Sequence, residues 1–140
     1  EKVRQRQRGQ SDFGSLEQLF RQMQSQQAEP KRLVLPTSEG LIFLPFEEIV
    51  YLQSDSNYTI FYTTHREKII VSRTLKEFEG VLERHHFFRV HNSFIVNLLQ
   101  IKRYVRGEGG TVVMRNEAEI EVSRRRKEDF IRKLETSAAN

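Results

Sequence analysis

The sequence predicts a mostly β domain with flanking helices, built from antiparallel strands and preceded by an amphipathic linker helix. The first observation is a series of short segments, rich in β-branched and aromatic residues, that begins near residue 32 and alternates with turn compositions. Short turns between strands favour antiparallel pairing. The second is that apolar residues recur at helical spacing in one internal and one C-terminal segment. The third is the distinct composition of residues 1–30, which are rich in Gln, Arg and Ser.

The N-terminal residues predict the linker helix. Pro30 would end it, and Ser15 with Gln18 fits a capping box, so we expect a helix over 15–28. Its apolar side would consist of Leu16, Leu19, Phe20 and Met23. The expected organisation is a linker over 1–30, one domain over 31–136 and a tail over 137–140.

Strand compositions follow one another through the expected domain. We expect strands over residues 32–35, 41–44, 49–52, 58–63, 68–71, 87–90, 101–106, 111–115 and 119–122. Turn residues separate several of them, as in Ser54–Asn57 and Gly107–Gly110. These turns fit hairpins between sequential strands.

Two helices are predicted within the domain. Thr74 and Glu77 form a capping-box pattern at the start of a helix over 74–84, and its apolar stripe is Leu75, Phe78 and Leu82. Ser123 is placed to cap a last helix, whose apolar side is Phe130, Ile131 and Leu134.

Composition limits the class of protein. The 140 residues have a net charge of +4 and no cysteine, which excludes disulfides, zinc knuckles and thiol catalysis. No apolar run approaches the roughly 18 residues needed to cross a bilayer, and the start does not resemble a signal peptide. We therefore expect a cytoplasmic protein without membrane contact. The absence of an initiator Met suggests a fragment of a longer chain.

Enzyme motifs are missing from the sequence. The four histidines do not have H-E-x-x-H spacing, and there is no P-loop, G-x-S-x-G or paired-carboxylate pattern. The glycines of Gly107–Gly110 lack the following Lys-Ser/Thr and fit a hairpin turn. His85 and His86 fit a solvated helix end better than a metal site. The sequence therefore predicts no catalysis, no cofactor and no metal.

Basic residues are concentrated in two places. Lys102, Arg103 and Arg106 lie in or beside one predicted strand, and Arg124–Lys127 begin the last helix. Cations at a helix N-terminus oppose the helix dipole by about 0.3–1 kcal/mol each at low salt, whereas an anion there reverses the sign. Phosphate is the obvious anion. The alternative is a solvated charge run beside Glu128 and Asp129.

The segment Phe87–Asn97 places polar residues among apolar ones; they are Arg89, His91, Asn92 and Ser93. In a major groove, Asn can bond to adenine N6 and N7, and Arg to guanine O6 and N7. On composition alone, a polar turn that links two strands is the stronger interpretation.

The same segment, with the sequence FFRVHNSFIVN, resembles the signature of the LytTR domain, an output module of bacterial response regulators. The resemblance continues in IVYLQSDSNY over 49–58, SRTLKEF over 72–78 and VSRR over 122–125. It implies an elongated antiparallel β fold in which loops enter successive major grooves of double-stranded DNA, commonly at direct repeats.

The resemblance also implies roles for residues. Asn92 and Arg125 match base-contacting positions, and the first recognition loop maps to Ser56, Asn57 and Tyr58. Some members contact DNA from that loop with a His that this chain lacks, so either Asn57 or Tyr58 would replace it. We expect phosphate contacts or loop support from Ser56, His91, Ser93, Lys102, Arg103, Arg124 and Arg126.

The expected function is sequence-specific DNA binding by the output domain of a two-component-type transcriptional regulator. A receiver domain would belong to the full-length protein, although membrane-anchored relatives exist. The linker helix could dock on its own domain or pair with a second copy, and tandem sites favour a homodimer on DNA. The alternative from another class is a protein-interaction module without DNA readout.

Overall fold

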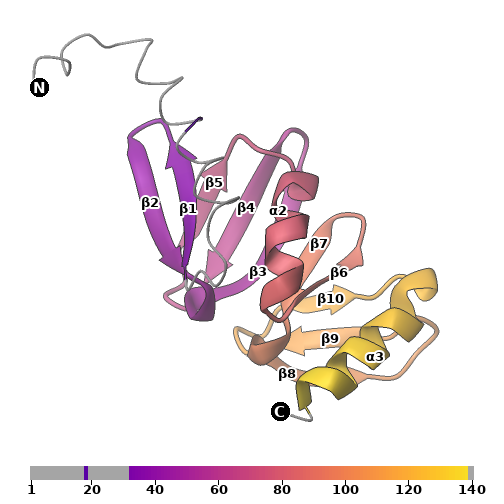
Figure 1. The fold of residues 1–140 in the computed structure, drawn as a ribbon. Helices are drawn as coiled ribbons and strands as arrows, with labels where there is room; N and C mark the ends of the chain where they lie inside the picture. The colour runs from indigo at the N-terminus through magenta and orange to yellow at the C-terminus, as the bar shows by residue number, and fades with distance from the viewer. Residues whose placement is uncertain (1–17, 19–31, 139–140) are drawn as a thin grey trace, which may run out of the picture. The chain divides into compact units, whose positions relative to one another are not determined.

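A computed structural model describes residue 18 and residues 32–138 (Figure 1). These residues form ten strands in antiparallel sheets, with two α-helices after the fifth and tenth strands, so the predicted mostly β class is confirmed. The chain divides into two compact units, residues 1–46 and 47–140. The expected linker helix lies outside the described residues except for Gln18.

The described part of the first unit is a hairpin. Strand β1 (Arg32–Thr37) pairs with β2 (Gly40–Pro45), and both strands extend farther into the turn than predicted. Gly40 has a φ of 135°, a conformation that favours glycine. The guanidinium of Arg32 lies over the ring of Phe43 at 4.6 Å from its centroid.

A five-stranded antiparallel sheet begins the second unit. Its order is β5-β4-β3-β7-β6, and the strands are β3 (Ile49–Asp55), β4 (Tyr58–Thr63), β5 (Lys68–Val71), β6 (Phe87–His91) and β7 (Phe94–Asn97). Strand β7 is absent from the sequence prediction, although it is an interior strand that lies between β3 and β6. Its four residues follow a polar turn and give too short a pattern to identify alone.

Helix α2 (Leu75–Leu82) packs on one face of this sheet, where the rings of Phe78 and Phe61 meet edge to face at 5.0 Å. The predicted stripe of Leu75, Phe78 and Leu82 is buried. The helix is shorter than predicted, because a 3-10 turn (Glu83–His85) takes over at its end.

The second sheet has the order β10-β9-β8 and consists of β8 (Ile101–Val105), β9 (Thr111–Met114) and β10 (Glu119–Glu121). Valine and methionine side chains of β9 share a hydrophobic core with Tyr51 and Val96 of the five-stranded sheet. Helix α3 (Lys127–Ala138) lies beside these strands in the ribbon of Figure 1, and its Phe130 belongs to the same core. Phe130 lies between Phe88 and Tyr104, with ring centroids 5.7 and 5.8 Å away.

The predicted apolar side of α3 is confirmed, since Phe130 is buried and Ile131 and Leu134 are partly buried against the core. The capping predictions are wrong in detail. Thr74 and Ser123 occupy N-cap positions, but neither side chain makes a capping hydrogen bond. The reason is that the amide three residues later already donates to the cap residue's own carbonyl, at 3.1 Å and 3.0 Å respectively.

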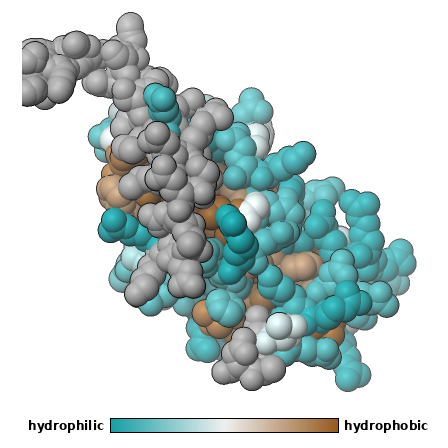
Figure 2. Space-filling view, in the orientation of Figure 1, coloured by the Kyte–Doolittle hydropathy of each residue, from teal (hydrophilic) through white to brown (hydrophobic). Residues whose placement is uncertain are grey.

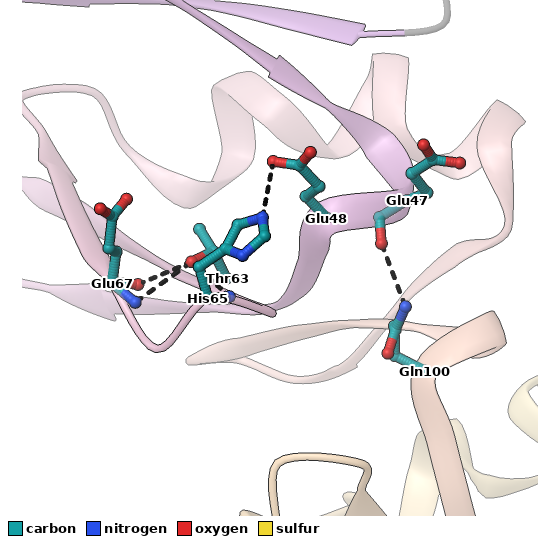
Figure 3. A network of polar contacts seen from close by, with 6 residues as sticks. All are labelled: Glu47, Glu48, Thr63, His65, Glu67 and Gln100. Atoms are coloured by element: carbon teal, nitrogen blue, oxygen red, sulfur yellow. Dashed lines mark hydrogen bonds and ion pairs between the residues drawn. The ribbon is translucent and has the colours of Figure 1, made fainter.

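Polar side chains contact one another and backbone carbonyls at the end of the five-stranded sheet where β3 begins (Figure 3). Gln100 Nε2 donates to the Glu47 carbonyl at 3.0 Å, and His65 Nε2 lies 3.7 Å from a Glu48 carboxylate oxygen. Thr63 Oγ1 donates to the Glu67 carbonyl at 3.2 Å. This network closes the end of the sheet opposite to the turns described next.

No helix in the described ranges is both long enough and apolar enough to cross a membrane.

Candidate nucleic-acid interface

Two of the predicted recognition segments lie at one end of the five-stranded sheet. The β3–β4 turn contains Ser56 and Asn57, and the β6–β7 turn contains Asn92 and Ser93. Strands β3 and β7 are antiparallel neighbours, with Gln53 opposite Phe94. The Ser54 amide donates to the Ser93 carbonyl at 2.9 Å, so the two turns are joined directly by backbone.

The third segment, the arginine run, is held against β6 just before its turn. The Ser123 amide donates to the Val90 carbonyl at 2.8 Å. Arg126 Nη1 donates to the Arg89 carbonyl at 3.3 Å. The structure therefore brings three segments together that are far apart in the sequence.

The β3–β4 turn exposes every side chain predicted there. Ser56 adopts a left-handed conformation with φ of 57°, which permits the two-residue turn. Asn57 is exposed, and Tyr58 keeps 48% of its surface accessible although aromatic residues are usually more covered. An exposed ring beside an exposed amide suits contact with a base edge or a thymine methyl.

The β6–β7 turn presents Asn92 to solvent and fixes its neighbours. His91 Nδ1 accepts a 3.1 Å hydrogen bond from the Ser93 amide, which requires that Nδ1 carries no proton. A register shift between Arg89 and His91 marks a β-bulge next to the turn. His91 and Ser93 are both half-buried, whereas Asn92 is exposed.

The arginines of the run have different surroundings. Residues Arg124–Arg126 form a 3-10 turn, in which successive side chains diverge by about 120°. Arg124 is exposed, with Nε 3.8 Å from a Glu108 carboxylate oxygen, and Arg125 is exposed with no partner among the described residues. Arg126 is half-buried and tied to the Arg89 carbonyl.

An open cavity of about 380 Å³ lies beside the arginine run. Its walls are the β8–β9 loop, the end of β10 with Ser123 and Arg124, and His91. Two glycines give the loop its shape, because a Cβ on Gly109 would overlap the Val122 carbonyl and a Cβ on Gly110 would overlap the Tyr104 ring. Tyr104 also donates from its hydroxyl to the Gly109 carbonyl at 2.9 Å.

Lys102 and Arg103 are placed apart from the three segments. They lie in the first half of β8, whose other end joins the cavity loop. Lys102 Nζ donates to a Glu117 carboxylate oxygen at 2.8 Å. That hydrogen bond and the charge of Lys102, with a further contribution from Arg103, hold the pKa of Glu117 below its usual value. Lys102 and Arg103 therefore lie near Glu117, at the end of the β8–β10 sheet opposite to the cavity loop.

Three residues that the predicted site omits are notable in the structure. Arg106, in the loop after β8, is exposed next to the cavity glycines. Arg89 contacts both α2 and the β6–β7 turn. Asn97, the last residue of the motif, is 2% exposed and donates from Nδ2 to the Ile49 carbonyl at 2.8 Å. The sequence could have indicated Arg106, because it follows Lys102 and Arg103 in the basic segment. The burial and the bonding partners of Arg89 and Asn97 depend on the fold and could not be predicted from the sequence.

The surface over the C-terminal strands and α3 is mostly hydrophilic in the view of Figure 2. Within the described residues, no three His, Asp or Glu side chains gather as a metal site would require. The exposed amide and guanidinium groups of Asn57, Asn92 and Arg125 are of the kinds that bind bases and phosphates.

Comparison with known proteins identifies the family of this domain. A family model described as the LytTr DNA-binding domain matches residues 39–135. The transcriptional regulatory protein YpdB of Escherichia coli strain CFT073 is 30% identical over 126 residues, which cover 82% of this chain and 51% of that protein. The sensory transduction protein LytT of Bacillus anthracis is 33% identical over 100 residues, which cover 69% of this chain and 40% of that protein.

A solved LytTr DNA-binding domain of a response regulator from Bacillus cereus superposes with a TM-score of 0.63 at 29% identity, covering 76% of this chain and 97% of that structure. The chain thus spans about half or less of the length of the regulators it matches. Because the family model covers more than half of the chain, the chain belongs to the LytTR family of DNA-binding domains, found in response-regulator-type transcriptional regulators.

Proposed function

We propose that this domain binds specific double-stranded DNA sequences by inserting loops into successive major grooves. Asn92, Arg125 and one of Asn57 or Tyr58 contact base edges. Arg124 contacts a backbone phosphate, while Ser56, His91 and Ser93 support the turns. The supporting observation is the pair of backbone hydrogen bonds that join the turns and the arginine run, Ser54 to Ser93 and Ser123 to Val90.

These backbone hydrogen bonds can hold a DNA-binding surface in place. They fix the spacing of the three segments without using any of the side chains needed for contact. Exposed Asn and Arg side chains then lie on a preformed framework, which lowers the ordering cost of binding. A surface made for a protein partner would instead be expected to have aromatic and apolar residues at its centre.

Other cations have separate places in this proposal. Arg126 anchors the run to β6, because its Nη1 is already bonded to the Arg89 carbonyl. Lys102 and Arg103 remain candidates for phosphate contact only if the duplex extends along β8. The direct-repeat site, the homodimer, the preceding receiver domain and the domain bounds 31–136 remain proposals drawn from the family.

The experiment is selection of binding sites from random duplexes, followed by titration of the selected duplex at several salt concentrations. If about four to six phosphates are neutralised, log K against log salt should slope by roughly −3.6 to −5.4. Enrichment of a defined sequence together with that slope supports the proposal. A flat salt dependence with no enriched sequence would favour the protein-interaction alternative.

A further inference from the structure

Arg89 joins an element outside the interface to the turn that presents Asn92. Its side chain is only 18% exposed. Nη1 donates to a carboxylate oxygen of Glu79 on α2 at 2.8 Å, and Nη2 donates to the Asn92 carbonyl at 2.6 Å. Both ends of the guanidinium are therefore occupied, one by a helix and one by the turn.

The backbone of the same residue also holds the arginine run, because the Arg89 carbonyl accepts the hydrogen bond from Arg126 Nη1. The next residue, Val90, accepts the bond from Ser123. One short stretch of β6 thus determines where both the Asn92 turn and the arginine run lie.

Only arginine can make the two side-chain contacts together. The guanidinium is planar and presents its two Nη groups in a fixed fork, so the position of Glu79 sets the direction in which Nη2 points. A lysine offers one compact ammonium and cannot reach both acceptors in the same way. Glu79 is 26% exposed and also neutralises the buried charge.

We propose that Arg89 is a positioning residue for base readout: aligned by Glu79, it fixes the peptide orientation at Asn92 and does not itself contact DNA. The part of this inference that concerns base readout rests on the proposed function. The inference has a consequence for the free protein as well, because loss of the contact should loosen the turn while the sheet below it stays folded.

The first arm uses the free domain. Amide relaxation and hydrogen exchange are measured by NMR for wild type, Arg89→Lys, Glu79→Gln and Arg132→Lys. Arg132→Lys is the matched control, since Arg132 pairs with Asp129 at 2.9 Å on an exposed face of α3 and the substitution conserves charge as Arg89→Lys does. We expect faster motion and exchange at Asn92 and Ser93 in the first two variants only. An unchanged turn in Arg89→Lys would overturn the proposal, whether or not the domain binds DNA.

The second arm measures competition between the selected duplex and a duplex altered at the base pair that Asn92 contacts. That base pair is identified as the one whose alteration weakens binding of wild type but not of Asn92→Ala. We expect Arg89→Lys to lower discrimination at that base pair about tenfold, and Arg132→Lys to leave it unchanged. The double variant Arg89→Lys/Asn92→Ala should discriminate no worse than Asn92→Ala alone. Equal weakening on every duplex, with discrimination at that base pair kept, would make Arg89 a phosphate contact instead. A wild type without any preference would refute the proposed function, and the first arm would still decide the role of Arg89.

Discussion

Asn92 and Asn97 lie just before and at the end of strand β7, and their surroundings are opposite. Asn92 is exposed in the turn, whereas Asn97 is 2% exposed and bonded to the Ile49 carbonyl and the Leu99 amide. The two asparagines of one motif therefore divide its roles: one is available to a ligand, and the other joins β7 to the start of β3.

The first prediction concerns Asn92. Asn92→Ala should weaken binding to the selected duplex by roughly 1–3 kcal/mol and binding to random duplexes far less, because one base-edge contact is lost. Its melting temperature should match wild type, since the side chain is exposed. Equal losses on both kinds of duplex, measured by competition, would contradict a base contact.

The second prediction concerns Asn97. Asn97→Ala should lower the free energy of unfolding by roughly 1–3 kcal/mol, because the buried Ile49 carbonyl and the Leu99 amide lose their partner. Urea unfolding followed by circular dichroism measures the change. Discrimination between duplexes, corrected for the folded fraction, should stay at the wild-type value. A stable variant with lost discrimination would place Asn97 in the interface.

Sequence patterns gave the fold class, nine of the strands and the stripes of both helices, because alternation and helical spacing are local properties. Strand β7 was missed because its identity comes from pairing with β3, not from its own four residues. The same pairing decides that Asn97 is buried and Asn92 is not, across a separation of 48 residues between Asn97 and Ile49. No local pattern contains that information.

The candidate site shows the same limit. The family resemblance identified both turns and the arginine run, which the backbone bonds bring together. It did not separate Arg126 from Arg124, since only the fold shows that Arg126 reaches the Arg89 carbonyl. Nor did the sequence reveal that Lys102 and Arg103 gather around Glu117, because that depends on the direction in which β8 runs.

The third prediction tests which end of the second sheet faces DNA, with two matched substitutions. Glu108→Gln removes the carboxylate beside Arg124, and Glu117→Gln removes the one beside Lys102. If phosphates lie at the arginine run, Glu108→Gln should tighten binding to all duplexes about two- to fivefold, and Glu117→Gln should have a smaller effect. Titrations at low and high salt measure both. The reverse order would assign the backbone contact to Lys102 and Arg103.

The fourth prediction separates the three arginines of the run by their surroundings. Arg125→Ala should relax specificity at one base pair, because its exposed side chain has no protein partner in the described residues and is free to contact a base edge. Arg124→Ala should weaken all duplexes alike and flatten the salt slope by up to about one. Arg126→Ala should lower the melting temperature, because it removes the bond to the Arg89 carbonyl that holds the run against β6. Selection from random duplexes, salt titration and thermal melting of each variant provide the three readouts. If all three variants lost specific and random binding in the same ratio and melted like wild type, the run would be a uniform electrostatic anchor, and the assignment of Arg125 to a base would be wrong.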